Sequence, residues 1–156
     1  MAPIRIGIVG LSTVSSSTSW AATAHLPYLR SSPKYEIVAL CNSSIERAHA
    51  SIEKYGLEGV KVYGSPQELA KDPNIDLAVC VVGVERHYEI LKPLVEAGKN
   101  VFTELPLAAS IDQMREPRHV GSEAEDLYHD RDAGQVNPVA NLIKSLISDG
   151  KLGKVA

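Results

Sequence analysis

The sequence predicts an α/β fold in which a doubly wound parallel sheet is covered by helices on both faces. Short runs of apolar and β-branched residues alternate with segments whose apolar residues recur at helical spacing. Serine and glycine residues stand at the boundaries of several helical segments, where they commonly cap helices. Because parallel neighbouring strands need helical crossovers, this alternation favours a parallel sheet.

The first unit of the fold is a strand, a loop and a helix. Ile4–Val9 is short, β-branched and followed by Gly10, which is typical of a buried parallel strand that feeds a tight turn. The polar loop Ser12–Ser19 follows, and its last serine is a candidate N-cap for a helix over Trp20–Leu29. Pro27 is expected to kink or end that helix.

The next elements repeat this alternation. Tyr35–Cys41 is predicted to be a strand, and Ser44 is expected to cap a helix over Ile45–Tyr55 that Gly56 ends. Val60–Tyr63 is predicted to be a short third strand.

Capping residues also predict the later helices. Ser65, Pro66 and Glu68 fit the N-cap, N1 and N3 positions of a short helix, and Ile75–Val82 is the most hydrophobic predicted strand. The remaining predicted elements are a helix over His87–Ala97 closed by Gly98, a strand over Asn100–Glu104, and a further helix opened by Ser110 and Gln113.

Size and composition limit the function. The chain has 156 residues, 44% of them hydrophobic and 22% charged, which suits one globular domain. The net charge of −3 leaves no basic excess for a phosphate backbone, so we expect no direct nucleic-acid partner. The longest apolar run, Leu77–Val84, is too short for a bilayer and no signal core precedes it, so we expect a cytoplasmic or nuclear protein. Cys41 and Cys80 lie inside apolar strands, where we expect buried thiols without a disulfide or metal.

The first strand-to-helix turn is the candidate cofactor site. In an open parallel sheet this turn offers backbone N–H groups and a positive helix end to a pyrophosphate. Gly10 holds the first position of the glycine-rich fingerprint, but Ser12 and Ser15 replace its second and third glycines. Hydroxyl groups can still donate to phosphate, so Ser12, Thr13 and Trp20 are the candidate contacts. The alternative is a surface loop that only joins strand to helix.

The end of the second strand bears on the choice between NAD and NADP. An Asp or Glu normally binds the ribose 2′-hydroxyl of NAD there, but this chain has Asn42, Ser43 and Ser44. Because this strand end has no carboxylate, nothing of that kind would repel a 2′-phosphate there. Ser43, Ser44 and Arg47 could bind the 2′-phosphate, so the sequence favours NADP, with NAD as the alternative. Asn42 and the serines could instead only cap the following helix.

Six motifs together resemble the Gfo/Idh/MocA oxidoreductase family over about Pro3–Gln113. They are Gly7–Gly10, Trp20–Ala21 with His25–Pro27, Asp76–Val79, His87–Glu89, Gly98–Val101 and Glu104–Leu107. Within the family, the chain resembles the fungal branch of the galactose-regulon repressor, a non-catalytic NADP binder. The resemblance implies a Rossmann domain that binds NAD(P), hydride transfer at a sugar-like or polyol carbon, and a second, antiparallel substrate domain.

The turn after the fifth strand departs from the family pattern. Family members carry a Glu-Lys-Pro motif whose lysine serves the reacting hydroxyl group, whereas this chain has Glu104–Leu105–Pro106. Leucine can neither donate a hydrogen bond nor titrate, so no catalytic residue is assigned. Glu104 and Pro106 match the family's cofactor-side turn, and the alternative is that they only end the strand.

Gly83 and His87 complete the candidate cofactor-binding set. In the family, the segment after the fourth strand passes under the cofactor, and Gly83 would permit a close backbone approach. His87 matches a family position near the nicotinamide edge, with helix capping or packing as the alternative. We expect His25 to pack or cap near Trp20 and Pro27 rather than to bind a ligand.

Three functional hypotheses remain open. The first is the cofactor-binding part of an NAD(P)-dependent oxidoreductase, with a Rossmann domain over residues 1–135 and a helix within 136–156 that would lead into a missing substrate domain. The second, favoured by Leu105, is a non-catalytic, NADP-responsive transcriptional regulator or interaction protein. The third is a non-functional fragment. Because the sheet edge and the last helix would be uncovered, we expect a homo-oligomer or a partner protein there.

Residues 114–135 break the pattern, and we interpret them as the product of a shifted reading frame. After a good capping box, the expected helix and sixth strand are replaced by Pro117, Gly121 and scattered charge. Codons allowed for Glu116–Gln135, read one base later, can encode an amphipathic helix followed by a strand. The alternative is a divergent insertion. The nucleotide sequence tests this hypothesis, and a gene in which no one-base shift yields such a peptide would contradict it.

Overall fold

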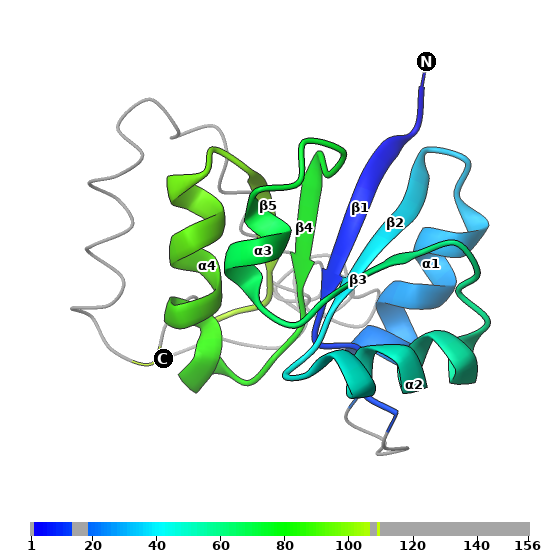
Figure 1. Cartoon of the computed structure of the whole chain (residues 1–156), viewed down its shortest axis with the longest axis horizontal. Coiled ribbons are helices and arrows are strands. Elements are labelled where there is room, and N and C mark those ends of the chain that lie inside the picture. Colours follow the sequence, from blue (N-terminus) through cyan, green and yellow to red (C-terminus); the bar gives the residue numbers. More distant parts are fainter. Residues whose placement is uncertain (1, 14–18, 107–108, 110–156) are drawn as a thin grey trace, which may run out of the picture.

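A five-stranded parallel sheet forms the centre of the structure (Figure 1). The computed structural model describes residues 2–13, 19–106 and 109. The strands are β1 (Ile4–Val9), β2 (Tyr35–Cys41), β3 (Lys61–Tyr63), β4 (Leu77–Cys80) and β5 (Asn100–Thr103). All their pairings are parallel and their order is β3-β2-β1-β4-β5, which confirms the predicted fold class.

Helices cover both faces of this sheet. They are η1 (Ala21–His25), α1 (Leu26–Ser31), α2 (Ile45–Tyr55), α3 (Pro66–Ala70), η2 (Val84–Arg86) and α4 (His87–Glu96). One core cluster packs residues of α3 and α4 against one face, and a second packs residues of η1, α1 and α2 against the other. Figure 1 shows α3 and α4 on the side of β4 and β5, and α1 and α2 on the side of β1 and β2.

Alternating side chains divide the strands between these two cores. In β1, Ile6 and Ile8 enter the cluster under α1 and α2, whereas Val9 enters the cluster under α3 and α4. Cys41 and Cys80 are buried in the latter cluster, which confirms the burial that the apolar strands predicted. Desolvation raises the pKa of the Cys41 thiol to about 11, so it is protonated at neutral pH.

Part of the sequence-based prediction lies outside the described residues, namely the helix opened by Ser110, the segment 114–135 and the helix within 136–156. Across the ranges that are described, no helix has the length and apolar character of a membrane span. The side chains of those ranges also bring together no group of three or more His, Cys, Asp and Glu residues that could hold a metal ion.

Three helix boundaries follow the predicted caps. Ser44 Oγ accepts a hydrogen bond from Arg47 N at 3.3 Å, and Ser65 Oγ accepts one from Glu68 N at 3.3 Å. Gly56 ends α2 with a φ of 58°, in the left-handed region that favours glycine. The local sequence is therefore sufficient to set the start and end of α2 and the start of α3.

Three strands are shorter than predicted. β3 begins at Lys61 rather than Val60, β4 covers Leu77–Cys80 rather than Ile75–Val82, and β5 ends at Thr103 rather than Glu104. β4 shows the physical reason most clearly, because its pairing with β1 runs only from Leu77 opposite Ile6 to Cys80 opposite Val9. At the carboxyl end, Val81 N still donates to Val9 O, but Gly10 then turns β1 away, so β1 offers a longer β4 no further residues to pair with.

The segment predicted as one helix over Trp20–Leu29 differs from expectation. It is a π-helical turn, η1, that continues into α1. Ser19 does not act through its side chain; its backbone carbonyl accepts hydrogen bonds from Ala22 N at 3.1 Å and Thr23 N at 3.0 Å. Pro27 does not end the helix; it lies at the junction where the π-helical turn, closed by the hydrogen bond from Leu26 N to Ala21 O, gives way to α1.

The turn after β1 passes very close to the segment after β4. Gly10 N donates to Cys41 O at 3.0 Å, and Val81 N donates to Val9 O at 2.9 Å. A Cβ at Gly10 would lie 2.4 Å from Val81 O, closer than real Cβ atoms approach another atom, and the φ of Gly10 is 98°. Glycine is therefore required here, and it lets the carboxyl ends of β1, β2 and β4 meet at one edge.

Arg5 and Asp76 join the opposite, amino ends of β1 and β4. Arg5 N and Arg5 Nε each donate to Asp76 Oδ2 at 2.9 Å, and Arg5 Nη2 donates to Asp76 Oδ1 at 2.6 Å. The side-chain hydrogen bonds from Arg5, followed by its backbone N–H, lower the pKa of Asp76 to about 2. The ionised form of Asp76 is therefore favoured by folding.

We predict that Gly10→Ala lowers the free energy of unfolding by at least about 3 kcal/mol, because overlap with a backbone carbonyl adds to the strain of a positive φ. Gly98→Ala is the matched control, since Gly98 has a φ of 69° but open space around the position of a Cβ. Its expected loss is about 1 kcal/mol. Urea unfolding of both variants measures the difference, and equal losses would contradict the steric explanation.

We predict that the free energy of unfolding falls as the pH drops from about 4 to about 2. Because the pKa of Asp76 is lower in the folded chain than the ordinary value of about 3.9, its stabilising effect is complete above that value and is lost as the pH falls towards 2. Asp76→Asn should be less stable than the parent at neutral pH and less sensitive to acid in this window. Denaturant unfolding at several pH values tests this, and an unchanged acid dependence in the variant would contradict it.

Candidate functional site

Two adjoining clefts lie over the carboxyl ends of the strands. The larger has a volume of about 530 Å³ and the smaller of about 320 Å³, and both are lined by Gly10, Ser12 and Val81–Gly83. The larger is also lined by Thr13, Asn42, Ser43, Arg47, Glu85 and Arg86, and the smaller by Ser19, Trp20 and Glu104. The carboxyl ends of the strands point to the lower edge of Figure 1, the edge at which open parallel sheets bind ligands.

Asn42, which directly follows β2, and three side chains of α2 hold the start of the loop after β1 through its backbone carbonyl groups. The bonds are Asn42 Nδ2 to Leu11 O at 2.9 Å, Ser51 Oγ to Leu11 O at 2.7 Å, Tyr55 OH to Ser12 O at 2.7 Å and Lys54 Nζ to Thr13 O at 2.5 Å. Because the donors all come from one strand end and one helix, Ser12 and Thr13 are placed in the cleft by the fold itself.

Asn42 lines the larger cleft and also holds the surrounding backbone. Besides its bond to Leu11 O, its Nδ2 lies 3.1 Å from Ser51 Oγ and 3.3 Å from Arg47 O. The helix cap is supplied by Ser44 rather than by Asn42. The amide group at the position of the usual acidic residue is therefore used to connect the end of β2 with the loop after β1.

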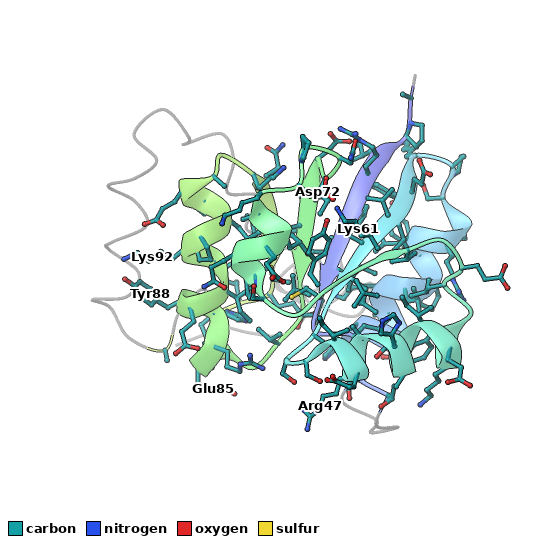
Figure 2. The ribbon with its side chains drawn as sticks, viewed as in Figure 1. Arg47, Lys61, Asp72, Glu85, Tyr88 and Lys92 are labelled. Carbon is teal, nitrogen blue, oxygen red and sulfur yellow. The ribbon has the colours of Figure 1, made fainter. Side chains whose placement is uncertain are left out.

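Ser43 and Arg47 form an exposed polar pair in the larger cleft. Arg47 Nη1 donates to Ser43 Oγ at 3.1 Å. Arg86, at the end of η2, lines the same cleft and is also exposed. Within the described part of the chain, neither guanidinium group has a carboxylate within ion-pair distance. Figure 2 shows Arg47 and Glu85 at the same lower edge of the molecule, far from Lys61 and Asp72.

Trp20 and Glu104 lie together in the smaller cleft. The Trp20 side chain is 55% exposed. Glu104 Oε1 lies 2.9 Å from His25 Nε2, and the His25 ring meets Phe102 edge-on with 5.5 Å between the ring centroids. The expectation that His25 packs near Trp20 and Pro27 missed this pair, because its members are 79 positions apart and no local pattern links them.

His87 is buried beneath the clefts, with 2% of its surface exposed. Its Nε2 lies 3.0 Å from Val82 O and its Nδ1 lies 3.1 Å from Pro106 O. Among the described residues, those that line the two clefts do not include His87 or Pro106. His87 thus connects the segment after β4 with the turn after β5, which also contains the exposed Leu105.

The larger cleft is also lined by residues that no sequence pattern predicted. Glu85 and Arg86 were missed, and so were Gly64 and Pro66 after β3. The signal that could have found Arg86 is its position shortly after β4, because the carboxyl ends of parallel strands share one edge. The structure brings together nine of the selected residues: Gly10, Ser12, Thr13, Trp20, Asn42, Ser43, Arg47, Gly83 and Glu104.

Comparison with known proteins shows similarity along nearly the whole chain. The chain is 32% identical over 161 residues to the galactose/lactose metabolism regulatory protein GAL80 of Saccharomyces cerevisiae, covering 99% of this chain and 36% of that protein. It is 34% identical over 163 residues to the dehydrogenase aclE of Aspergillus oryzae, covering 97% and 42%. The chain therefore spans about two fifths of the length of these relatives.

Structural comparison gives the same result. A crystal structure of a mutant of KijD10, a 3-ketoreductase from Actinomadura kijaniata in complex with TDP-benzene and NADP, matches with a TM-score of 0.79 and 25% sequence identity, covering 98% of this chain and 46% of that one. The model of the Gfo/Idh/MocA oxidoreductase family with the NAD-binding Rossmann fold matches residues 4–129. The chain therefore belongs to the Gfo/Idh/MocA oxidoreductase family, and its described residues form the NAD-binding Rossmann fold of that family.

Proposed function

We propose that this chain is the dinucleotide-binding domain of a Gfo/Idh/MocA oxidoreductase and that it binds NADP in preference to NAD. The observation that carries the proposal is the pair formed by Ser43 and Arg47 in the larger cleft, at the end of a strand that lacks the usual carboxylate. A 2′-phosphate offers acceptor oxygens to both side chains, and no carboxylate at this strand end opposes it. The NADP in the similar KijD10 structure supports the same choice.

The rest of the cleft suits the remainder of a dinucleotide. Volumes of about 530 and 320 Å³ lie within the usual range for ligand sites. In our proposal Gly10, Ser12 and Thr13 hold the pyrophosphate, Asn42 faces the adenosine ribose, and Gly83 lies under the nicotinamide half. The exposed indole of Trp20 and the carboxylate of Glu104 border that half in the smaller cleft. The nicotinamide, when bound, supplies the hydride acceptor or donor.

His87 and Pro106 act indirectly in this proposal. His87 contacts the carbonyl groups of Val82 and Pro106, so it fixes the distance between the two turns that border the nicotinamide half. Glu104 lies in the second of these turns and is held by His25. These four residues are therefore positioning or binding residues, and none of them is assigned a catalytic role.

Hydride transfer is proposed only for a longer protein that contains this domain. The chain spans only 36% and 42% of the relatives named above. We therefore infer three features of the longer protein from the family: the reaction at a sugar-like or polyol carbon, the substrate domain, and the division at residue 135. Leu105 stands where the family motif has its lysine, and its side chain is apolar and 47% exposed. We therefore expect no turnover by this chain alone.

A non-catalytic regulator that responds to NADP is the second candidate function. Leu105 favours it, and so does the 32% identity to the regulatory protein GAL80. Both candidates require the same dinucleotide site and differ in whether a substrate is reduced. A chain that binds neither NADPH nor NADH would instead be a non-functional fragment.

We predict that the purified chain binds NADPH at least about tenfold more tightly than NADH, because the 2′-phosphate adds charge-assisted hydrogen bonds. The fluorescence of the nucleotide and of Trp20, the single tryptophan, measures both dissociation constants. Arg47→Gln should reduce the preference, because it weakens the binding of NADPH more than the binding of NADH. Lys34→Gln removes the same charge at the amino ends of the strands, where Lys34 O accepts a hydrogen bond from Ile4 N, and should leave the preference intact.

Two results would contradict the proposal in different ways. Equal affinities of the parent chain for NADPH and NADH would overturn the assignment to NADP while keeping dinucleotide binding. The absence of binding to either nucleotide at millimolar concentration would overturn dinucleotide binding itself.

A further inference from the structure

The larger cleft contains a second exposed arginine from a different element. Arg47 comes from the first turn of α2, after β2, whereas Arg86 ends η2, after β4. In the sheet order these two strands lie on either side of β1. The cleft is therefore bordered by one guanidinium group on each side of the turn at Gly10.

We propose that Arg86 is the second cationic arm of a phosphomonoester site and reads the 2′-phosphate of the dinucleotide together with Arg47 and Ser43. This inference rests on the proposed function and adds a specificity-determining residue to it. A phosphomonoester carries about two negative charges at neutral pH and presents three acceptor oxygens. Two guanidinium groups and one hydroxyl group supply a matching set of donors.

The charges around Arg86 support this role. Among the described residues, no carboxylate lies within ion-pair distance of Arg86 or Arg47, although the chain as a whole has a net charge of −3. Arg5, in contrast, is fully engaged by Asp76 at the other end of the sheet. Arg5 thus forms an ion pair at the amino edge of the sheet, whereas Arg47 and Arg86 are available to a ligand at the carboxyl edge.

Glu85 also lines the cleft and opposes anion binding there. Its carboxylate packs against Gly83, so that a Cβ at Gly83 would lie 2.2 Å from Glu85 Oε1. A bound phosphate must share the cleft with this charge or displace it. Replacing Glu85 by glutamine should therefore strengthen NADPH binding more than NADH binding.

The test compares NADPH with NADH on the parent chain and on Arg86→Gln, Arg86→Lys and Glu85→Gln. We expect Arg86→Gln to weaken NADPH binding about tenfold or more while changing NADH binding by less than about twofold. Arg86→Lys keeps the charge and should recover part of the loss. Lys34→Gln, far from the cleft, controls for the general effect of removing one positive charge, and circular dichroism checks that each variant is folded.

The outcomes separate this inference from the function on which it rests. If the parent binds NADPH but Arg86→Gln weakens NADPH and NADH equally, Arg86 contacts the adenosine common to both and the inference is wrong. If Arg86→Gln changes neither affinity, the inference is wrong and the Ser43–Arg47 site stands alone. If the parent binds neither nucleotide, the proposed function fails, and the inference fails with it.

Discussion

The close approach of Gly10 to Val81 is the constraint on which the site depends. Because Gly10 lacks a Cβ and adopts a φ of 98°, the turn after β1 can lie directly against the backbone that leaves β4. In the same turn, Gly10 N donates a hydrogen bond to Cys41 O at the end of β2. Three strand ends therefore meet at one edge, and the polar residues that follow each of them line the same cleft.

The two edges of the sheet have different physical characters. At the amino ends, Arg5 and Asp76 satisfy each other, and Asp72 is enclosed by Tyr63, Lys61 and the backbone of Asn74, which hold the pKa of its carboxyl well below the usual range. At the carboxyl ends, Arg47 and Arg86 are exposed, and the backbone of the loop after β1 is held by side chains of Asn42, Ser51, Lys54 and Tyr55. The first edge contributes to stability, and the second is available to a ligand.

Sequence reasoning predicted the elements whose boundaries are set locally. Ser44, Ser65 and Gly56 act where their residue types indicate. Strand ends were less predictable, because β4 stops where its partner β1 turns away, and this depends on a residue far away in the sequence. The same reason explains the missed contacts of His25 with Glu104, and of His87 with Pro106: each joins segments that only the folded chain brings together. Arg86 has no distinctive motif, and its place in the cleft follows from the strand order.

The most direct test of the central claim is a crystal structure of the chain grown with NADP. The account predicts density for the pyrophosphate beside Gly10 and Ser12, the 2′-phosphate beside Ser43 and Arg47, and the nicotinamide towards Trp20 and Glu104. Density for the dinucleotide at any other surface, with this cleft free of it, would contradict the account.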